Sequence, residues 1–300
     1  MIVEKEVGKD ALAKVYIARS KRGLFEFAES LTPPLPREEK WVIILSCLLG
    51  CPVQCLMCDA GQNYQGCLSK EEIFEQIDFL VKKRFPSGKI SVKKWKIQFT
   101  RMGEPAFNPA VLDVLEELPA RYEAPGLMPS LSTIGPLSCD GFFERLIEIK
   151  NRHYSNGRFQ MQFSIHTTDI QKRDLLIPIK KMSFQDIAHF AENFHQKGDR
   201  KITLNFIQME DYPLAPKILK EYFDPKLFLV KLTPLNPTQR AQGNGLRSSL
   251  KLYSPNVLPV VAELQKEGFE VIVSIGEWEE NEIGSNCGQY VSALTRRSLT

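Results

Sequence analysis

From residue 41 onward, short apolar segments alternate with longer amphipathic segments. The short segments are rich in Val, Ile, Leu and Phe, which is typical of buried strands, and the longer ones have the pattern of helices. Strands separated by helices pair in parallel through right-handed crossovers. Strands are predicted over 41–46, 94–100, 129–134, 158–166, 201–209, 227–235 and 270–276, and helices over 69–84, 108–118, 140–150, 183–197, 213–222 and 255–267. This series predicts an α/β fold, a partial (β/α)6 barrel.

Local signals support this division of the chain. Ser69 with Glu72 forms a capping box at one helix start, and Ser183 with Asp186 forms a similar one. Residues 14–30 alternate around a Lys-Arg-Gly turn and predict a β-hairpin. The proline-rich stretch 31–40 cannot lie in a helix interior or a central strand. We therefore expect an N-terminal hairpin and connector over 1–40 and a core barrel with a C-terminal loop over 41–300.

Composition narrows the class of protein. With 43% hydrophobic and 25% charged residues, the chain is typical of globular proteins rather than disordered or collagen-like ones. No apolar run approaches the ~18 residues of a membrane helix, and the N-terminus has no signal-peptide pattern. Seven cysteines cannot all pair with one another. A cytoplasmic protein is expected, in which clustered cysteines indicate a metal centre or catalysis rather than disulfides.

Three cysteines are spaced C-x3-C-x2-C directly after the first strand of the core. These are Cys51, Cys55 and Cys58. In β/α barrels the chemistry gathers at the carboxyl ends of the strands, which is where this triplet falls. Thiolates at this spacing bind zinc or an iron–sulfur cluster. A closed zinc site needs a fourth ligand, whereas three thiolates on a four-iron cluster leave one iron open. A zinc knuckle and incidental buried thiols are the alternatives.

The stretch CPVQCLMC over 51–58 resembles the signature of radical S-adenosylmethionine (SAM) enzymes. The resemblance implies that Cys51, Cys55 and Cys58 hold a [4Fe–4S] cluster. Its open iron would chelate the amino and carboxylate groups of SAM, and electron transfer would cleave the sulfonium to give a 5′-deoxyadenosyl radical.

Later motifs resemble one branch of this superfamily, the RlmN/Cfr family of class A methyltransferases that act on RNA adenines. The motifs are RMGEP (101–105), LSTIG (131–135), FSIHTTD (163–169), RDLLIPI (173–179), LTPLNPT (232–238) and NCGQ (286–289). They follow the family order, and six ordered matches are far harder to obtain by chance than one. Arg101 departs from the family, which has glycine there.

The resemblance implies roles for residues in these motifs. Gly103 and Glu104 would meet the amino end of SAM, with the carboxylate accepting a charge-assisted hydrogen bond. The side chains on the nucleoside side would be those of Ser132, Ser164, His166 and Asn236. Without the family context, the glycine can be a turn residue, the histidine a core residue, and the serines partners of backbone groups only.

Cys287, near the C-terminus, matches the family's methyl carrier. One SAM would methylate its thiolate, and a second would supply the radical that takes hydrogen from the new S-methyl group. The resulting methylene radical would add to an electrophilic amidine carbon of adenine. Serine could not replace it, because only a thiolate accepts the first methyl group.

The match fails at the family's second cysteine, which breaks the enzyme–RNA thioether by forming a disulfide with the carrier. That position is Ile44 here, and Cys47 lies three residues further along. An odd offset turns a strand side chain to the opposite face, so Cys47 serves only if it belongs to the following loop. Cys67 and Cys139 are weaker candidates for this role.

The family also carries a catalytic glutamate before the cluster, for which Glu26 or Glu29 is the candidate. Forty residues cannot hold the helical N-terminal domain of these RNA enzymes, so we expect the catalytic core without that adaptor.

The expected partners follow from the same reading. Basic segments such as 89–96 and 150–158 are candidate contacts to an rRNA or tRNA substrate, or else solvated surface. A net charge of +3 does not by itself favour nucleic acid. An electron donor such as flavodoxin or ferredoxin is implied, with no membrane partner and a monomeric state. One alternative is an enzyme with the same radical core that acts on a peptide, protein or small molecule. A third hypothesis, ranked last, is a non-catalytic metal-binding scaffold.

Overall fold

The computed structural model describes residues 1–61, 63–250, 257–276, 278–284 and 290–291. Its centre is a ten-stranded sheet with the order β1-β2-β3-β4-β7-β8-β9-β10-β11-β12. The first three strands are antiparallel, namely β1 (Ile2–Lys9), β2 (Ala13–Arg19) and β3 (Leu24–Ser30). The other seven are mutually parallel, namely β4 (Lys40–Leu45), β7 (Lys94–Phe99), β8 (Leu127–Thr133), β9 (Gln160–Ser164), β10 (Ile202–Gln208), β11 (Phe228–Pro234) and β12 (Glu270–Val273). The expected α/β class with a large, mostly parallel sheet is confirmed.

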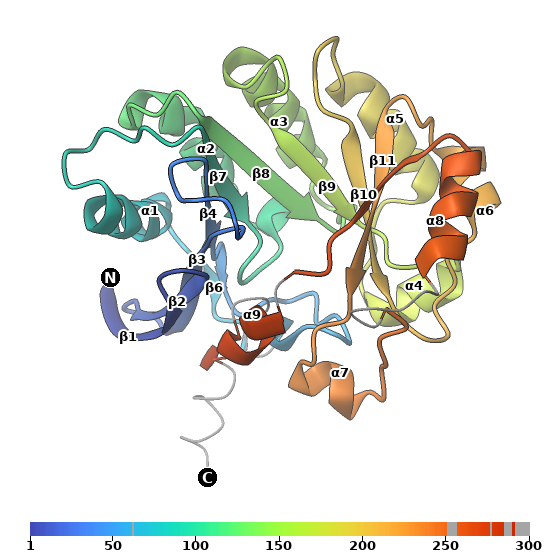
Figure 1. The fold of residues 1–300 in the computed structure, drawn as a ribbon, viewed down its shortest axis with the longest axis horizontal. Coiled ribbons are helices and arrows are strands. Elements are labelled where there is room, and N and C mark those ends of the chain that lie inside the picture. The colour runs from blue at the N-terminus through green and yellow to red at the C-terminus, as the bar shows by residue number, and fades with distance from the viewer. Residues whose placement is uncertain (62, 251–256, 277, 285–289, 292–300) are drawn as a thin grey trace.

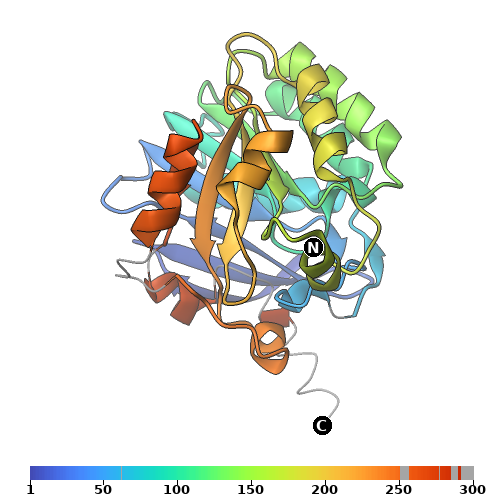
Figure 2. The ribbon, with the colours of Figure 1, turned by 90° about the vertical axis from the view of Figure 1, so that its right-hand side faces the viewer.

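Helices connect the successive parallel strands and line the outer side of the sheet (Figure 1). They are α1 (Lys70–Arg84), α2 (Ala110–Arg121), α3 (Asp140–His153), α5 (Phe184–Phe194), α6 (Pro216–Tyr222) and α8 (Val257–Lys266). Figure 2, turned by 90°, shows α5, α6 and α8 in front of β10 and β11. Both capping boxes form, at Ser69 of α1 and Ser183 of α5. None of the helices among the described residues has the length and apolar character that a membrane crossing requires.

Shorter elements gather where the parallel strands end, at the lower side of Figure 1. They are β5 (Leu48–Leu49), β6 (Gly66–Cys67), α4 (Ile170–Leu176), α7 (Gln239–Gly243) and α9 (Trp278–Ile283). Two 3₁₀ turns, η1 (Asp59–Gly61) and η2 (Pro105–Phe107), complete this edge. The carboxyl-terminal edge of the sheet is therefore covered by loops and short elements, as expected for a site of chemistry.

The two faces of the parallel sheet differ in chemistry. One face packs its apolar side chains, such as Trp41, Ile97, Phe163 and Val230, into the main core beneath the helices. The alternate residues point to the opposite side, which we call the inner face. They are Lys40, Val42, Ile44, Lys94, Lys96, Gln98, Met128, Ser130, Ser132, Gln160, Gln162, Ser164, Thr203, Asn205, Ile207, Leu229, Lys231 and Thr233. Most of them are polar, so the inner face is not a second apolar core.

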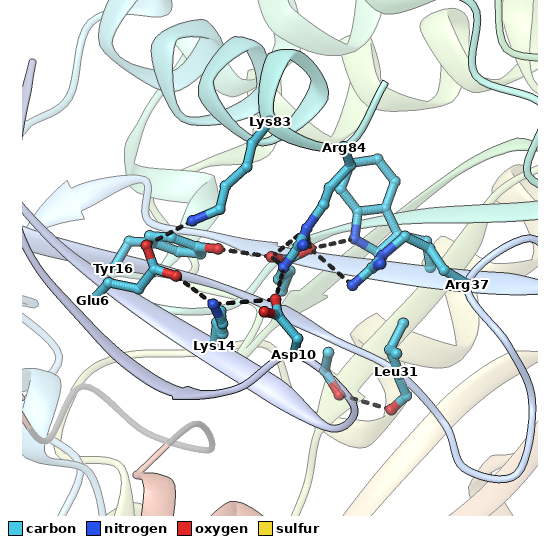
Figure 3. Close-up of polar contacts among 11 residues, drawn as sticks. Glu6, Asp10, Lys14, Tyr16, Leu31, Arg37, Lys83 and Arg84 are labelled. Carbon is cyan, nitrogen blue, oxygen red and sulfur yellow. Dashed lines mark hydrogen bonds and ion pairs between the residues drawn. The ribbon is translucent and has the colours of Figure 1, made fainter. Parts of the chain in front are cut away.

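The predicted hairpin of residues 14–30 forms as β2 and β3, and a buried carboxylate ties it to α1. Glu29 accepts hydrogen bonds from the Tyr16 hydroxyl at 2.7 Å, from Trp41 Nε1 at 2.9 Å and from Arg84 Nε at 2.9 Å. Figure 3 shows Arg84 at the centre of this network, with Asp10 and further ion pairs around it. Burial and the nearby Glu29 charge raise the pKa of Tyr16. The hairpin is thus fixed to the core by interactions on the helix-covered side of the sheet.

Strand β1 was not predicted. It pairs with β2 at the edge of the sheet, and most of its residues are exposed. An exposed edge strand needs few apolar residues, so the sequence carries little of the alternation that marks a half-buried strand.

Candidate active site

The three clustered cysteines lie on one loop at the carboxyl-terminal edge of the sheet. The short strands β5 and β6 pair at the base of this loop. Within it, the Cys58 N–H donates to the Cys55 carbonyl at 3.2 Å, and Gln54 adopts a left-handed conformation at φ 58°. A Cβ on Gly61 would lie 2.9 Å from Gln54 Cα, so the loop closes on a position that requires glycine. The side chains of Cys51, Cys55 and Cys58 are each partly buried, and no disulfide links them to the other described cysteines.

Contacts with later elements hold the loop in place. The Leu56 N–H donates to the Leu176 carbonyl at the end of α4, at 3.0 Å. The Thr238 hydroxyl donates to the Met57 carbonyl at 2.7 Å. The Asp59 carboxylate accepts from the first backbone N–H groups of α7, those of Gln239 at 3.1 Å and Arg240 at 2.9 Å. The motifs at 173–179 and 232–238 therefore anchor the cysteine loop.

Burial disfavours ionisation of the clustered thiols. Burial raises the pKa of Cys51 to about 11 and that of Cys55 to about 12, although backbone N–H groups of the loop and of Glu104 oppose the shift. Thiols with raised pKa values lose their protons to a bound cationic centre, which supplies the missing positive charge. Among the described residues, no three Cys, His, Asp or Glu side chains converge closely enough for a single metal ion. Three adjacent sulfur donors on one loop fit an iron–sulfur cluster.

Glu104 lies beside this loop and is buried. It follows Gly103, whose φ is +100° and whose added Cβ would lie 2.4 Å from Leu48 Cγ, so only glycine fits there. The Glu104 carboxylate accepts a hydrogen bond from the Thr133 hydroxyl and one from the Ile134 N–H at 2.9 Å. Burial raises the pKa of Glu104 to about 7 despite these bonds. A cation binding beside it would favour the charged carboxylate.

The remaining predicted SAM-side residues fall at or just after the ends of β8, β9 and β11. Ser132 and Ser164 lie on the inner face, partly accessible, and their hydroxyls make no hydrogen bond with the described residues. Asn236 is partly accessible after β11. These three side chains therefore face the same edge as the cysteine loop.

His166 is placed differently. It is buried, has φ +68°, and its Nδ1 accepts from the Ile207 N–H at 3.2 Å. Burial lowers its pKa to about 3, so the ring is neutral and its proton is on Nε2.

A pocket of about 420 Å³ opens beside the cysteine loop and is lined by Pro52, Phe107, Leu137, Ser138, Ile179 and Lys180.

A buried ion pair joins the N-terminal hairpin to the loop after β7. Arg101 Nη2 lies 2.6 Å from Glu26 Oε1, and both side chains are excluded from solvent at 1% and 0% exposure. Arg101 also donates to the Gly284 carbonyl at 2.7 Å. The other oxygen of Glu26 accepts from the backbone N–H groups of Tyr290 and Val291, each at 3.1 Å. The pair therefore holds the chain on both sides of residues 285–289, which lie outside the described residues and include Cys287.

The two candidate glutamates have different surroundings. Glu29 belongs to the network with Arg84 on the helix-covered side, whereas Glu26 faces the C-terminal segment. Of the two, only Glu26 contacts the described residues that follow the segment 285–289. The role of Arg101 was missed from the sequence, where it counted only as a departure from the family pattern. The sequence feature that could have indicated it is a second charged residue, besides Glu104, in the motif RMGEP.

Of the cysteines considered for the second thiol, Cys47 and Cys67 are neighbours at the β5–β6 pair, where the Leu68 N–H donates to the Cys47 carbonyl at 3.0 Å. Cys47 follows the end of β4 but is fully buried in the main core, where burial raises its pKa strongly. Cys67 lies on β6, with its Sγ 3.3 Å from the Phe107 carbonyl oxygen, and Cys139 caps α3. Ile44, where the family has its second cysteine, packs with Tyr290 against a small cluster that includes Ala28 and Ile283.

Comparison with known proteins gives the following. No protein-family model matches the chain. A Pseudothermotoga lettingae protein named "Probable dual-specificity RNA methyltransferase RlmN" is 28% identical over 200 residues, covering 65% of this chain and 54% of the relative. A Thermosipho melanesiensis protein of the same name is 25% identical over 260 residues, covering 85% and 69%. The chain thus spans between about half and about two thirds of the length of these curated relatives.

Among solved structures, a radical SAM methyltransferase from Sphaerobacter thermophilus aligns with a TM-score of 0.72 at 19% identity. The alignment covers 96% of this chain and 80% of that one, and at this identity the likeness concerns the fold. Together with the relatives, it confirms the resemblance to the RlmN/Cfr family of radical SAM proteins that the motifs indicate.

The ion pair of Glu26 and Arg101 gives a testable prediction. Glu26→Gln leaves the Arg101 guanidinium buried without a counter-charge, which is expected to lower the free energy of unfolding by roughly 3–5 kcal/mol. Glu26→Gln combined with Arg101→Met removes both charges and is expected to recover a large part of that loss. Urea denaturation of the wild type and of each single and double variant measures the coupling between the two residues. Additive losses would show that the pair is not coupled.

Proposed function

We propose that this chain, a protein similar in sequence to RlmN relatives and in fold to a radical SAM methyltransferase, methylates an sp2 carbon of an RNA adenine. The proposal rests on where the candidate residues lie in the fold. The three thiols, Glu104 and both flanks of the Cys287 segment meet at the carboxyl-terminal edge of one parallel sheet. The names of the relatives supply the RNA substrate, because they are RNA methyltransferases by name.

In this proposal residues 41–300 form a partial (β/α)6 barrel and residues 1–40 an extension of its sheet. Cys51, Cys55 and Cys58 hold a [4Fe–4S] cluster, and Gly103 and Glu104 receive the amino end of SAM. When bound, the cluster supplies the electron that opens SAM to radical chemistry. The nucleoside side of SAM lies along Ser132, Ser164, His166 and Asn236. The free hydroxyls of the two serines support this placement, since they have hydrogen-bonding capacity left for a ligand.

Cys287 is the proposed methyl carrier. The thiolate attacks the methyl carbon of one SAM, which forms the S–CH₃ bond, breaks the sulfonium–methyl bond and releases S-adenosylhomocysteine. Cys287 is three residues in sequence from both Gly284 and Tyr290. Glu26 and Arg101 hold these flanks by the bonds described above. Glu26 accordingly acts as a positioning residue for the carrier in this proposal.

Partners and location follow from the same chemistry. A reducing cytoplasm would preserve both the thiols and the cluster, and a flavodoxin or ferredoxin would supply the electron. We propose a monomer, with rRNA or tRNA as the methyl acceptor.

The roles of the carrier and the cluster can be separated by two substitutions. Cys287→Ala is expected to abolish methyl transfer to RNA while reductive cleavage of SAM continues, because the cluster ligands are intact. Cys51→Ala is expected to abolish both, because one cluster ligand is lost. Mass spectrometry of RNA nucleosides and chromatography of 5′-deoxyadenosine measure the two activities. Methylated RNA from Cys287→Ala would rule out the carrier role.

Residue 44 offers a test of where Cys287 lies. Because Ile44 and Tyr290 pack against the same cluster, Ile44→Cys is expected to form a disulfide with Cys287 on mild oxidation. Ile43→Cys is the matched control, since its side chain points into the main core on the opposite face of β4. Peptide mapping under non-reducing conditions identifies the bridge. A bridge in the Ile43→Cys variant rather than in Ile44→Cys, or in neither variant, would contradict the proposed position of the carrier.

A further inference from the structure

Four lysines lie on the inner face of the sheet. Lys40 and Lys94 are register partners at the amino-terminal ends of β4 and β7. Lys96 follows two residues further along β7, and Lys231 lies on β11, where its register partner is Asn205 of β10. All four side chains are half-buried. The alternation of β7 therefore splits the basic segment 89–96 between the two sides of the sheet.

Register and alternation place Lys40, Lys94 and Lys96 side by side on the inner face, and Lys231 points to the same face from β11. Burial lowers the pKa of Lys96, and so do the charges of Lys231, Lys94 and Lys40. Burial and the charge of Lys40 lower the pKa of Lys231. Since β7 and β11 are separated by three strands in the sheet, Lys231 acts on the other lysines across the inner face rather than along neighbouring strands. The lysines thus form one cationic group rather than four separate surface charges.

No acid neutralises this group within the described part of the chain. None of the four ammonium groups makes a hydrogen bond or ion pair there. Nearby carboxylates are already engaged, Glu270 with Lys201 at 3.5 Å and Asp199 with Lys150 at 2.5 Å. By contrast Lys93, on the other side of β7's start, pairs with Glu39 at 2.6 Å.

The surrounding inner face is also polar and unpaired. Asn205 is buried, and its Oδ1 has no hydrogen-bond partner. The side chains of Gln98, Ser130 and Gln162 make no hydrogen bonds with other described residues, although they lie in the same layers. Barrel interiors are usually filled by branched apolar residues. A half-buried, polar interior with repelling charges is costly unless a ligand completes it.

We propose that Lys40, Lys94, Lys96 and Lys231 bind a phosphate group on the inner face of the sheet. Several ammonium groups from different strands match a group that carries more than one charge and several acceptor oxygens. Lys96 precedes the end of β7 by three residues, so it lies about 10 Å from the carboxyl-terminal edge. Resting on the proposed function, we assign the phosphate to the nucleotide substrate, which would reach from the lysines toward the cysteine loop.

Thermal unfolding of the full chain tests this site with defined probes: inorganic phosphate, adenosine 5′-monophosphate and a short oligoribonucleotide. A ligand that binds only the folded state raises the midpoint of unfolding. At least one probe is expected to do so in the wild type, and Lys96→Gln or Lys231→Gln is expected to weaken its binding by about tenfold or more. Without ligand, each of these variants is expected to unfold at a higher temperature than the wild type, because a repelling, half-buried charge is gone.

Lys93→Gln is the matched control, one residue before Lys94 but paired outside the inner face, and it should bind the probes as the wild type does. Binding of phosphate and the mononucleotide alone would identify a free nucleotide as the source of the group, and binding of the oligoribonucleotide would identify RNA. The proposal is overturned if no probe shifts the midpoint, or if Lys93→Gln weakens binding as much as Lys96→Gln. Probe binding requires neither cluster nor SAM, so its failure leaves the tests of methyl transfer unaffected.

Discussion

The buried ion pair between Glu26 and Arg101 connects the N-terminal hairpin, the loop after β7 and the segment near the C-terminus. Two charges removed from solvent stabilise a fold only when they pair well and gain further hydrogen bonds. Here those further bonds go to backbone groups on either side of residues 285–289. The pair therefore fixes the N-terminal hairpin, the loop that leads to Glu104 and the C-terminal segment in one arrangement. Because Glu26 belongs to the hairpin and must stay paired with Arg101, the hairpin contributes directly to the candidate site.

The two faces of the sheet have different roles. The helix-covered face carries the apolar core and the Glu29 network, which together stabilise the fold. The inner face is polar, with serines near the carboxyl-terminal edge and lysines in the first half of β4 and β7 and in the middle of β11. Because alternate residues of one strand serve the two faces, a single short segment such as 94–99 supplies both core and ligand-facing side chains. The same strands thus support stability and binding without interfering with each other.

The sequence was sufficient for the parts that depend on local pattern. Strand and helix alternation predicted the parallel sheet, and the capping boxes at Ser69 and Ser183 predicted two helix starts. What it could not supply depends on contacts between distant residues. The pairing of Arg101 with Glu26 joins residues 75 positions apart, and the meeting of Lys96 with Lys231 depends on how the sheet curves. Nothing local distinguishes Lys93 from Lys94, although they point to opposite sides of the sheet.

The central claim is that the segment held by Glu26 and Arg101 presents a thiol that carries a methyl group. Peptide mass spectrometry of protein purified anaerobically, after expression with abundant iron, tests it most directly. The account predicts a mass increase of one methylene, ~14 Da, on the peptide that contains Cys287. An unmodified Cys287 in protein that holds its cluster and cleaves SAM would contradict it. The fold would then serve a radical reaction of another type.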